Sequence, residues 1–344
     1  MTALREAPDR TLTVLDAGDR RWRELVDADP SALPFHHSAW SSLLGEVYGY
    51  RPFLLGLEDP AGGLVGGIPV MEVRGPLGGR RWISLPFTDY VPPLGAPAPQ
   101  LLDSARRRAG IKRFELHAEL SGPGVFPGGE AVRHVLPLQQ DAAAVLRTFH
   151  RSQVQRNIRK AERSGVAVRR ATAADDVADA FYRLHVGTRR RLGVPVQPRR
   201  FFAALWERMI EPGRGFVLLA ESDGAPVAGA VFLVHGDTVI YKYGASDAGS
   251  WSLRPNHAIF WEAIRSSCEA GRRRFDFGRT DLADVSLREF KAHWGTEELP
   301  MAYATLADRA PEAGPSGRAL APIIRRSPPW VCRAIGEALY KHAA

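Results

Sequence analysis

Cysteine, lysine and long apolar runs are all scarce in this chain of 344 residues. The two cysteines, Cys268 and Cys332, belong to no CxxC pair and no Cys/His cluster, which excludes a disulfide framework and favours a reduced, cytoplasmic protein. The opening segment MTALREAPDR has no apolar core, so we expect no signal peptide. The longest apolar stretch, APVAGAVFLV, is far shorter than the roughly 20 residues that span a bilayer. We therefore expect no transmembrane segment and at most a peripheral contact with a membrane.

Several motifs that identify common enzyme classes are also missing. The chain has no GxxxxGK(S/T) loop, no GxGxxG after a strand, no HExxH and no GxSxG. These absences argue against a P-loop nucleotide site, a dinucleotide site, a zinc protease and a serine hydrolase. His36 and His37 are adjacent, but no further metal ligand lies at a suitable spacing. We expect no metal and no tightly bound cofactor.

Most of the basic residues are arginine, since only five of the 46 lysines and arginines are lysines. A GC-rich coding sequence explains such an arginine excess without any function. The net charge of +8 and the isoelectric point near 9.8 favour contact with polyanions such as RNA, diphosphates or anionic lipid. Charge alone does not choose among these partners.

Two parts of the chain resemble each other in their order of strands and turns. FLLGLEDPAGGLVGGIPVMEV, from Phe53, and FVLLAESDGAPVAGAVFLVHG, from Phe216, each read as a strand, an acidic turn and a second strand, which is a hairpin pattern. Further on, ARRRAGIKRFELH and SSCEAGRRRFDFG each end a helix at a glycine, Gly110 or Gly271, and then enter a strand. Both pairs recur at nearly the same offset, which predicts a duplicated unit.

The repeat predicts an α/β fold in which each half is a mixed sheet covered by helices. We place an N-terminal domain at residues 1–140 and a C-terminal domain at residues 141–306. SGPGVFPGGE, residues 121–130, reads as a loop. A long helix is predicted from Asp141, its N-cap, to Gly165. The dense basic residues of this helix form either a solvated face or a surface for phosphates.

Residues 307–344 read as a linker followed by a C-terminal helix. ADRAPEAGPSGRALAP, residues 307–322, has the composition of a linker. In PPWVCRAIGEALYKHAA the prolines start a helix, and one face of that helix carries Trp330, Ala334, Ile335, Ala338 and Leu339. The nearby basic residues would suit an anionic membrane, but we favour docking of this face on the protein body.

The second half of the chain gathers polar residues around the end of a strand and the start of a helix. Tyr241 and Tyr243 in VIYKYGAS fall on one face of a strand by the period of two. At the start of the next helix lie Arg254, Asn256 and His257, where free N–H groups and the helix dipole suit a phosphate or a carboxylate. Helix capping explains each of these three residues singly. Taken together with Tyr243, they indicate a substrate-binding site.

The same region contains LRPNHAIFWEAI, RRFDFGRTD and LREFKAHWG in this order, with NIRKAERSGV upstream. These motifs resemble the Fem-type branch of the GNAT-like acyltransferases, which includes the peptidoglycan interpeptide-bridge ligases that use aminoacyl-tRNA. FHHSAW, YGYRPFLL and SLPFTDYVPPLG resemble the matching N-terminal segments, so the resemblance runs from about Phe35 to Tyr303. It implies two tandem GNAT-like acyltransferase domains, in agreement with the repeat, and a C-terminal tail that packs on the first domain.

The resemblance also implies a catalytic residue. The family's lysine in an FK-x-x-aromatic-Gly motif maps onto Lys291 of FKAHWG. A fixed ammonium group there would stabilise the oxyanion that forms when an amine attacks an ester carbonyl. Asp276 would orient the acceptor amine or pair with Arg279.

Further binding residues are implied less directly. We expect Asp89 and Tyr90 of PFTDY to line an acceptor cleft between the domains. Arg156 and Lys160 would contact a diphosphate or the backbone of tRNA.

A departure from the GNAT pattern bears on the acyl donor. GNAT enzymes that use acetyl-CoA carry a (Q/R)-x-x-G-x-(G/A) loop, whereas SWSLRPNHA has no glycine, so backbone amides approach a pyrophosphate less easily. We therefore predict an amide-forming aminoacyltransferase that uses aminoacyl-tRNA and acts on a cell-wall precursor or an amine-bearing pathway intermediate. An acyl-CoA-dependent N-acyltransferase acting on an envelope sugar or small amine is the alternative, and a non-catalytic basic RNA-binding module is a further one.

Overall fold

The computed structural model describes residues 10–75, 78–311 and 321–342. The chain forms two compact units, Met1–Glu130 with Met301–Ala313, and Ala131–Pro300 with Gly314–Ala344. The segment Met301–Ala313 belongs to the first unit because the end of strand β12 (Glu297–Ala307) pairs antiparallel with strand β5 (Arg113–Leu116). The domain limits that we predict from sequence do not contain such a return, since a distant strand partner leaves no local signal.

The sheet of the first unit has the strand order β1-β2-β3-β4-β5-β12. Its other strands are β1 (Thr11–Asp16), β2 (Arg51–Glu58), β3 (Leu64–Arg74) and β4 (Arg80–Ile83), and its helices are α1 (Arg20–Ala28), α2 (Ser38–Tyr48) and α3 (Pro99–Arg108). Neighbouring strands run antiparallel except β4 and β5, which run parallel because α3 crosses over between them. Leu55, Ile68, Phe114 and Leu306 are fully buried in the core of this unit.

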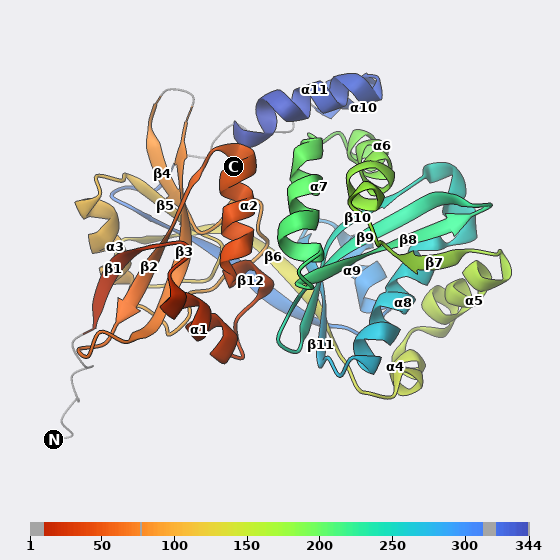
Figure 1. Ribbon diagram of the computed structural model, residues 1–344, viewed down its shortest axis with the longest axis horizontal. Helices are drawn as coiled ribbons and strands as arrows, with labels where there is room; N and C mark the ends of the chain where they lie inside the picture. Colours follow the sequence, from red (N-terminus) through yellow and green to blue (C-terminus); the bar gives the residue numbers. More distant parts are fainter. Residues whose placement is uncertain (1–9, 76–77, 312–320, 343–344) are drawn as a thin grey trace. The chain divides into compact units, whose positions relative to one another are not determined.

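The sheet of the second unit has the strand order β6-β11-β10-β9-β8-β7. Its strands are β6 (Val125–Pro137), β7 (Ala167–Arg170), β8 (Gly215–Ser222), β9 (Ala225–His235), β10 (Thr238–Ser246) and β11 (Arg274–Asp281). Its helices are α4 (Ala142–Thr148), α5 (Arg156–Arg163), α6 (Tyr182–Leu192), α7 (Arg199–Leu205), α8 (Pro255–Glu269) and α9 (Val285–Ala292). Helices α6 and α7 lie on one face of the sheet, and α4, α5 and α8 lie on the other (Figure 1). The predicted α/β fold with mixed sheets is therefore confirmed.

The predicted repeat is visible in the order of the elements. The two hairpins are β2–β3 and β8–β9, both antiparallel. Helices α3 and α8 are each followed by a glycine in the left-handed conformation, Gly110 with φ of 68° and Gly271 with φ of 71°. Each helix then leads into a strand that runs parallel to the strand before it, which gives the pairs β4–β5 and β10–β11. A helix that crosses between two parallel strands is thus present in both halves.

The prediction of one long helix over residues 141–165 is wrong, because the helix is interrupted in its middle. The Asp141 side chain accepts from the Ala143 N–H at 2.9 Å, as an N-cap should, but α4 ends after Thr148. Phe149 is extended, and its ring is buried against the core of the second unit. A π-helical turn over Arg151–Gln155 then restarts the helix before α5. Burial of the Phe149 ring overrides the local helical preference of this segment.

Part of the loop predicted at residues 121–130 belongs to strand β6. Glycine and proline in VFPGGE signal a loop, but glycine also allows a close approach of backbones. A Cβ atom on Gly128 would lie 2.9 Å from Cβ of Tyr303 and 3.0 Å from its carbonyl oxygen. The glycine is therefore required by close packing in the sheet.

The C-terminal helices α10 (Ala321–Arg326) and α11 (Pro329–Leu339) pack on α6 of the second unit, whereas the resemblance implied the first domain. The buried side of α11 carries Cys332 and Gly336, and Trp330 of the predicted docking face is 65% exposed. A glycine is required at position 336 on this side, because a Cβ atom there would lie 2.0 Å from the carbonyl oxygen of Val196. Most of the predicted linker, residues 312–320, lies outside the described residues.

Candidate active site

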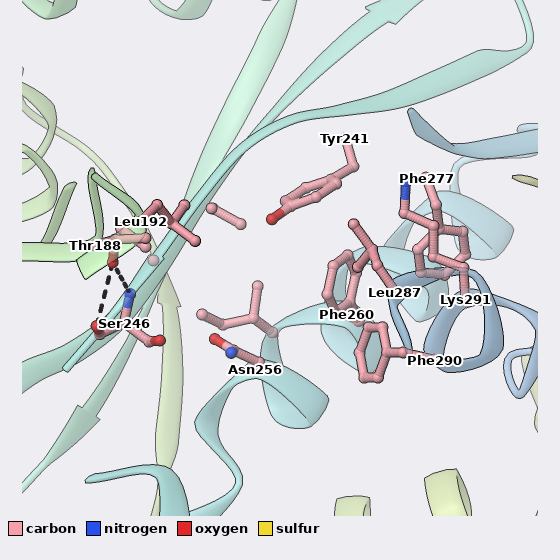
Figure 2. A pocket seen from close by; sticks show the side chains of 15 residues that line it. Thr188, Leu192, Tyr241, Ser246, Asn256, Phe260, Phe277, Leu287, Phe290 and Lys291 are labelled. Carbon is pink, nitrogen blue, oxygen red and sulfur yellow. Dashed lines mark hydrogen bonds between the residues drawn. The ribbon is translucent and has the colours of Figure 1, made fainter. Parts of the chain in front are cut away.

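A pocket opens in the second unit where strands β10 and β11 separate. The two strands pair only from Thr238 to Ile240 and from Arg274 to Asp276, although both continue beyond these residues. The space between their ends is a cavity of about 280 Å³. It is lined by Thr188, Leu192, Gly229, Ala230, Tyr241, Gly244, Ala245, Ser246, Asn256, Ile259, Phe260, Phe277, Leu287, Phe290 and Lys291. In Figure 2, Thr188, Leu192 and Ser246 lie on one side of the pocket, and Phe277, Phe290 and Lys291 lie on the other.

The side of the pocket that contains Lys291 is aromatic. The ring of Phe260 on α8 lies 4.9 Å from Tyr241 on β10 and 5.1 Å from Phe277 on β11, measured between ring centroids. The ring of Phe290 on α9 lies 6.1 Å from Phe260. These rings make this side of the pocket apolar, and a charge acts more strongly in apolar surroundings than it does in bulk water.

Lys291 is only 3% exposed, and its ammonium group is held at two points. Nζ donates to the carbonyl oxygen of Gly278 at 2.8 Å and to that of Arg279 at 3.2 Å. The register of β11 against β6 shifts just before Arg279, and Gly278 has φ of 71°. Glycine adopts this left-handed conformation without strain, so the irregular strand turns two carbonyl groups toward the lysine. The structure thus places a fixed cation at the wall of the pocket.

Asp276 lies at the same irregularity, but it is not among the residues that line the pocket. Its buried carboxylate accepts from the Gly278 N–H at 2.8 Å and from Nη1 of Arg133 at 3.2 Å. Burial raises the pKa of Asp276, and the positive charge of Arg133 opposes that rise. Arg279, the partner expected from sequence, forms an ion pair with Asp281. Asp276 therefore stabilises the shape of β11 next to Lys291, and a role toward an acceptor amine stays a prediction.

The three residues predicted at the start of α8 have different surroundings. Asn256 lines the pocket, whereas Arg254 and His257 do not. Arg254 is exposed and precedes the helix with φ of 63°. His257 is buried, with Nε2 3.1 Å from the carbonyl oxygen of Gln153 and its ring stacked on Trp294. Burial lowers the pKa of His257 to about 4, so the ring is neutral at pH 7, and packing accounts for this residue.

Tyr241 and Tyr243 do not share a face of β10, which corrects the prediction from the period of two. They pair with adjacent residues of β9, so Lys242 is an extra residue that bulges out of the strand. Tyr241 lines the pocket, and Figure 2 shows its hydroxyl directed toward the cavity. Burial raises the pKa of Tyr241 to about 12, so this hydroxyl is neutral. Tyr243 packs instead against Phe201 and Phe202 and is not part of the pocket lining.

Comparison with known proteins agrees with this geometry. Residues 148–292, which include the strands of the pocket and Lys291, match the model of the acetyltransferase (GNAT) domain. Lipid II:glycine glycyltransferase of Staphylococcus epidermidis is 32% identical over 83 residues, which are 22% of this chain and 20% of that protein. The crystal structure of FemX matches with a TM-score of 0.63 at 15% identity, over 84% of this chain and 96% of that one. A tandem GNAT protein from the clavulanic acid biosynthesis pathway matches with a TM-score of 0.52 at 14% identity, over 90% of this chain and 100% of that one.

The chain thus contains a segment, residues 148–292, that matches a GNAT acetyltransferase domain, and a stretch of 83 residues that is similar to a lipid II glycyltransferase. The two solved structures show the fold, which is that of tandem GNAT proteins over most of the chain. This chain covers 20% of the length of the curated glycyltransferases that it matches.

The other predicted binding residues lie outside the pocket. Arg156 and Lys160 are exposed on α5, on the side opposite to its buried residues, and contact with phosphates there stays a prediction. Asp89 and Tyr90 belong to the first unit and are half-buried, and the Asp89 carbonyl accepts from the Tyr303 hydroxyl at 2.8 Å. Their assignment to an acceptor cleft also stays a prediction.

Sequence reasoning missed most residues of the pocket. Thr188 comes from α6, where no motif was recognised, and Ser246, at the end of the VIYKYGAS strand, donates its N–H to Oγ1 of Thr188 at 3.0 Å. Phe260, Phe277 and Phe290 lie within the quoted motifs, but the motifs alone assigned no role to them. Their periodicity was a usable signal for burial, but not for a cavity.

In the part of the chain that the structure describes, no group of three or more His, Cys, Asp or Glu side chains could hold a metal ion. No helix among the described residues is long and apolar enough to cross a membrane.

Proposed function

We propose that this protein transfers an aminoacyl group from aminoacyl-tRNA to an amine and so forms an amide bond. The observation that supports this proposal most is the ammonium group of Lys291, which is buried at the wall of the pocket and fixed by the carbonyl groups of Gly278 and Arg279. A cation in such an apolar site favours a step in which negative charge develops next to it.

In the proposed reaction, the neutral amine of the acceptor attacks the ester carbonyl carbon of the donor. A C–N bond forms, and negative charge develops on the carbonyl oxygen, where the ammonium group of Lys291 stabilises it. The C–O bond to the ribose then breaks, and the proton that the amine loses passes to the ribose oxygen. Because the ester is already activated, the reaction requires no covalent enzyme intermediate, which agrees with a pocket lined by aromatic residues. The neutral hydroxyl of Tyr241 supplies a further hydrogen bond to the donor.

The start of α8 supports aminoacyl-tRNA as the donor. A CoA pyrophosphate loop uses glycines so that successive backbone amides can approach the phosphates. Here the left-handed residue before the helix is Arg254, and the preceding Ala248–Leu253 segment is a 3₁₀ turn. The side chain of Arg254 occupies space that a glycine would leave open. The glycyltransferase named above acts on lipid II, and we extend from it to an amine-bearing cell-wall precursor as the acceptor.

The alternative is an acyl-CoA-dependent N-acyltransferase. The match to the acetyltransferase domain model favours it, because that model describes the second unit without reference to tRNA. The same pocket and the same lysine would then serve a thioester instead of an ester.

Transfer assays separate the two donors. Purified protein is incubated with radiolabelled aminoacyl-tRNA and a panel of amine acceptors, including a peptidoglycan-precursor peptide with a free amine. We expect labelled amide that disappears when ribonuclease is added before the enzyme. Activity that survives ribonuclease treatment would show that the donor is not tRNA, and tight binding of CoA in calorimetry would favour the alternative.

A further inference from the structure

An exposed tryptophan lies next to the pocket, on the side away from Lys291. Trp251 is 50% exposed, although it belongs to a short 3₁₀ turn without buried residues. Its indole N–H donates to Oγ of Ser246 at 2.9 Å, and Ser246 lines the pocket. A large apolar ring is thus held in a defined orientation while one side stays open to solvent. Folding alone gives little reason to fix a ring that remains half exposed.

Arg191 lies over this ring and is itself held by the wall of the pocket. Its guanidinium carbon is 5.2 Å from the centroid of the Trp251 ring. Nη2 donates to the carbonyl oxygen of Ser246 at 2.7 Å and to Oγ1 of Thr188 at 3.1 Å. Arg254 ends the same 3₁₀ turn and adds a second exposed cation. An aromatic face beside fixed positive charge is the combination that binds a nucleotide, because the base stacks and the phosphate is attracted.

We propose that Trp251 and Arg191 bind an adenine nucleotide of the acyl donor, with the base stacked on Trp251 and a phosphate near Arg191 and Arg254. This inference rests on the proposed function, and it identifies the end of the donor that the site recognises. In Figure 2, Ser246 and Thr188 lie across the pocket from Lys291, so the base and the reacting carbonyl occupy opposite sides of one cavity.

Adenine is present in both donors under consideration. In aminoacyl-tRNA the ester is carried by the terminal adenosine itself, whereas in CoA a long pantetheine arm separates the adenine from the thioester. A base platform that shares Ser246 with the pocket therefore suits the adenosine of the 3′-terminal CCA sequence better than it suits CoA.

The test compares three variants with the unchanged protein. Trp251→Leu removes the ring, Trp251→Phe keeps an aromatic face, and Trp330→Leu removes another exposed tryptophan, one on α11, as a matched control. The dissociation constant of a short RNA that ends in CCA is measured by fluorescence anisotropy, and that of CoA by calorimetry. We expect Trp251→Leu to weaken RNA binding by about 5- to 150-fold, the range for loss of one stacked base, whereas the phenylalanine and Trp330 variants stay close to the original.

Arg191 is tested through its salt dependence. Arg191→Gln should reduce the slope of the logarithm of RNA affinity against the logarithm of salt concentration by about 0.7, as expected for one lost contact to a single strand. The midpoint of thermal unfolding is recorded for every variant to show that the fold is kept.

The outcomes separate this inference from the proposed function. If Trp251→Leu weakens CoA binding and the RNA does not bind, the adenine platform holds and the tRNA donor is wrong. If Trp251→Leu binds both ligands as tightly as the original protein, or if neither ligand binds the original protein, the platform is wrong. The transfer assay with Lys291 variants still decides the proposed function in that case.

Discussion

Replacement of Lys291 by methionine tests the proposed chemistry most directly. Methionine has a similar length and suits an aromatic environment, so the change removes the charge and leaves most of the packing. Two effects must be separated, because Lys291 lines the pocket and its ammonium group also satisfies the carbonyl groups of Gly278 and Arg279.

The structure gives a magnitude for each effect. Loss of a charged donor that stabilises an oxyanion costs about 2.7–4 kcal/mol in the transition state, which corresponds to roughly 10²–10³ in rate. Buried carbonyl groups that lose their donor cost about 1–3 kcal/mol each in folding free energy. We therefore expect Lys291→Met to be both less stable and at least a hundredfold slower, and Lys291→Arg to be slow as well because a planar guanidinium group does not fit the same carbonyl pair.

A matched control distinguishes the two effects. The Thr296 hydroxyl donates to the carbonyl oxygen of Lys291 at 3.0 Å, so Thr296→Val destabilises the same helix end and keeps the ammonium group. Rates are measured per folded molecule, at a temperature where circular dichroism shows every variant to be native. Thr296→Val should retain nearly full transfer activity. If Lys291→Met is as active as the original protein under these conditions, the charge has no role in the reaction and a binding function is favoured.

Three further changes test the pocket and the fold. Tyr241→Phe should lower kcat/KM by roughly 2- to 10-fold, which is the effect of one neutral hydrogen bond, and should leave the midpoint of thermal unfolding unchanged. An unaltered kcat/KM would exclude contact between the Tyr241 hydroxyl and the donor. Gly336→Leu should lower the free energy of unfolding by about 1–3 kcal/mol in urea titrations, because a Cβ atom there would lie 2.0 Å from the carbonyl oxygen of Val196. An unchanged midpoint of unfolding would contradict the packing of α11 on α6. The folded chain binds a proton at His257 only near pH 4, whereas the unfolded chain binds it at the ordinary pKa of 6.5. The free energy of unfolding should therefore fall by about 1.4 kcal/mol per pH unit as the pH drops from about 6.5 to about 4. His257→Gln should remove this part of the slope in urea titrations at pH 7 and pH 5, and an identical slope in the variant would show that the ring is not held neutral.

Local sequence signals were sufficient for the repeat, whereas Lys291 was indicated by a family resemblance. Hairpin turns and glycines after helices act over a few residues, so the β2–β3 and β8–β9 hairpins and the ends of α3 and α8 could be predicted at Gly110 and Gly271. Lys291 was singled out by the resemblance of FKAHWG to the family's lysine motif, and its scarcity as a residue type only raised the question. Its burial and its position at the pocket are consistent with that signal.

Tertiary structure decided which side chains share the cavity. The bulge at Lys242 turns Tyr241 toward the pocket and Tyr243 away from it, and alternation along a single strand contains no information about a bulge. Asp276 pairs with Arg133, which is far away in sequence and reaches it only because β6 and β11 are neighbours. The return of β12 to the first unit and the choice of the Gly336 side of α11 likewise depend on partners that are distant along the chain. A sequence fixes such contacts only through the free energy of the whole fold, whereas a turn or a helix end depends on the few residues that form it.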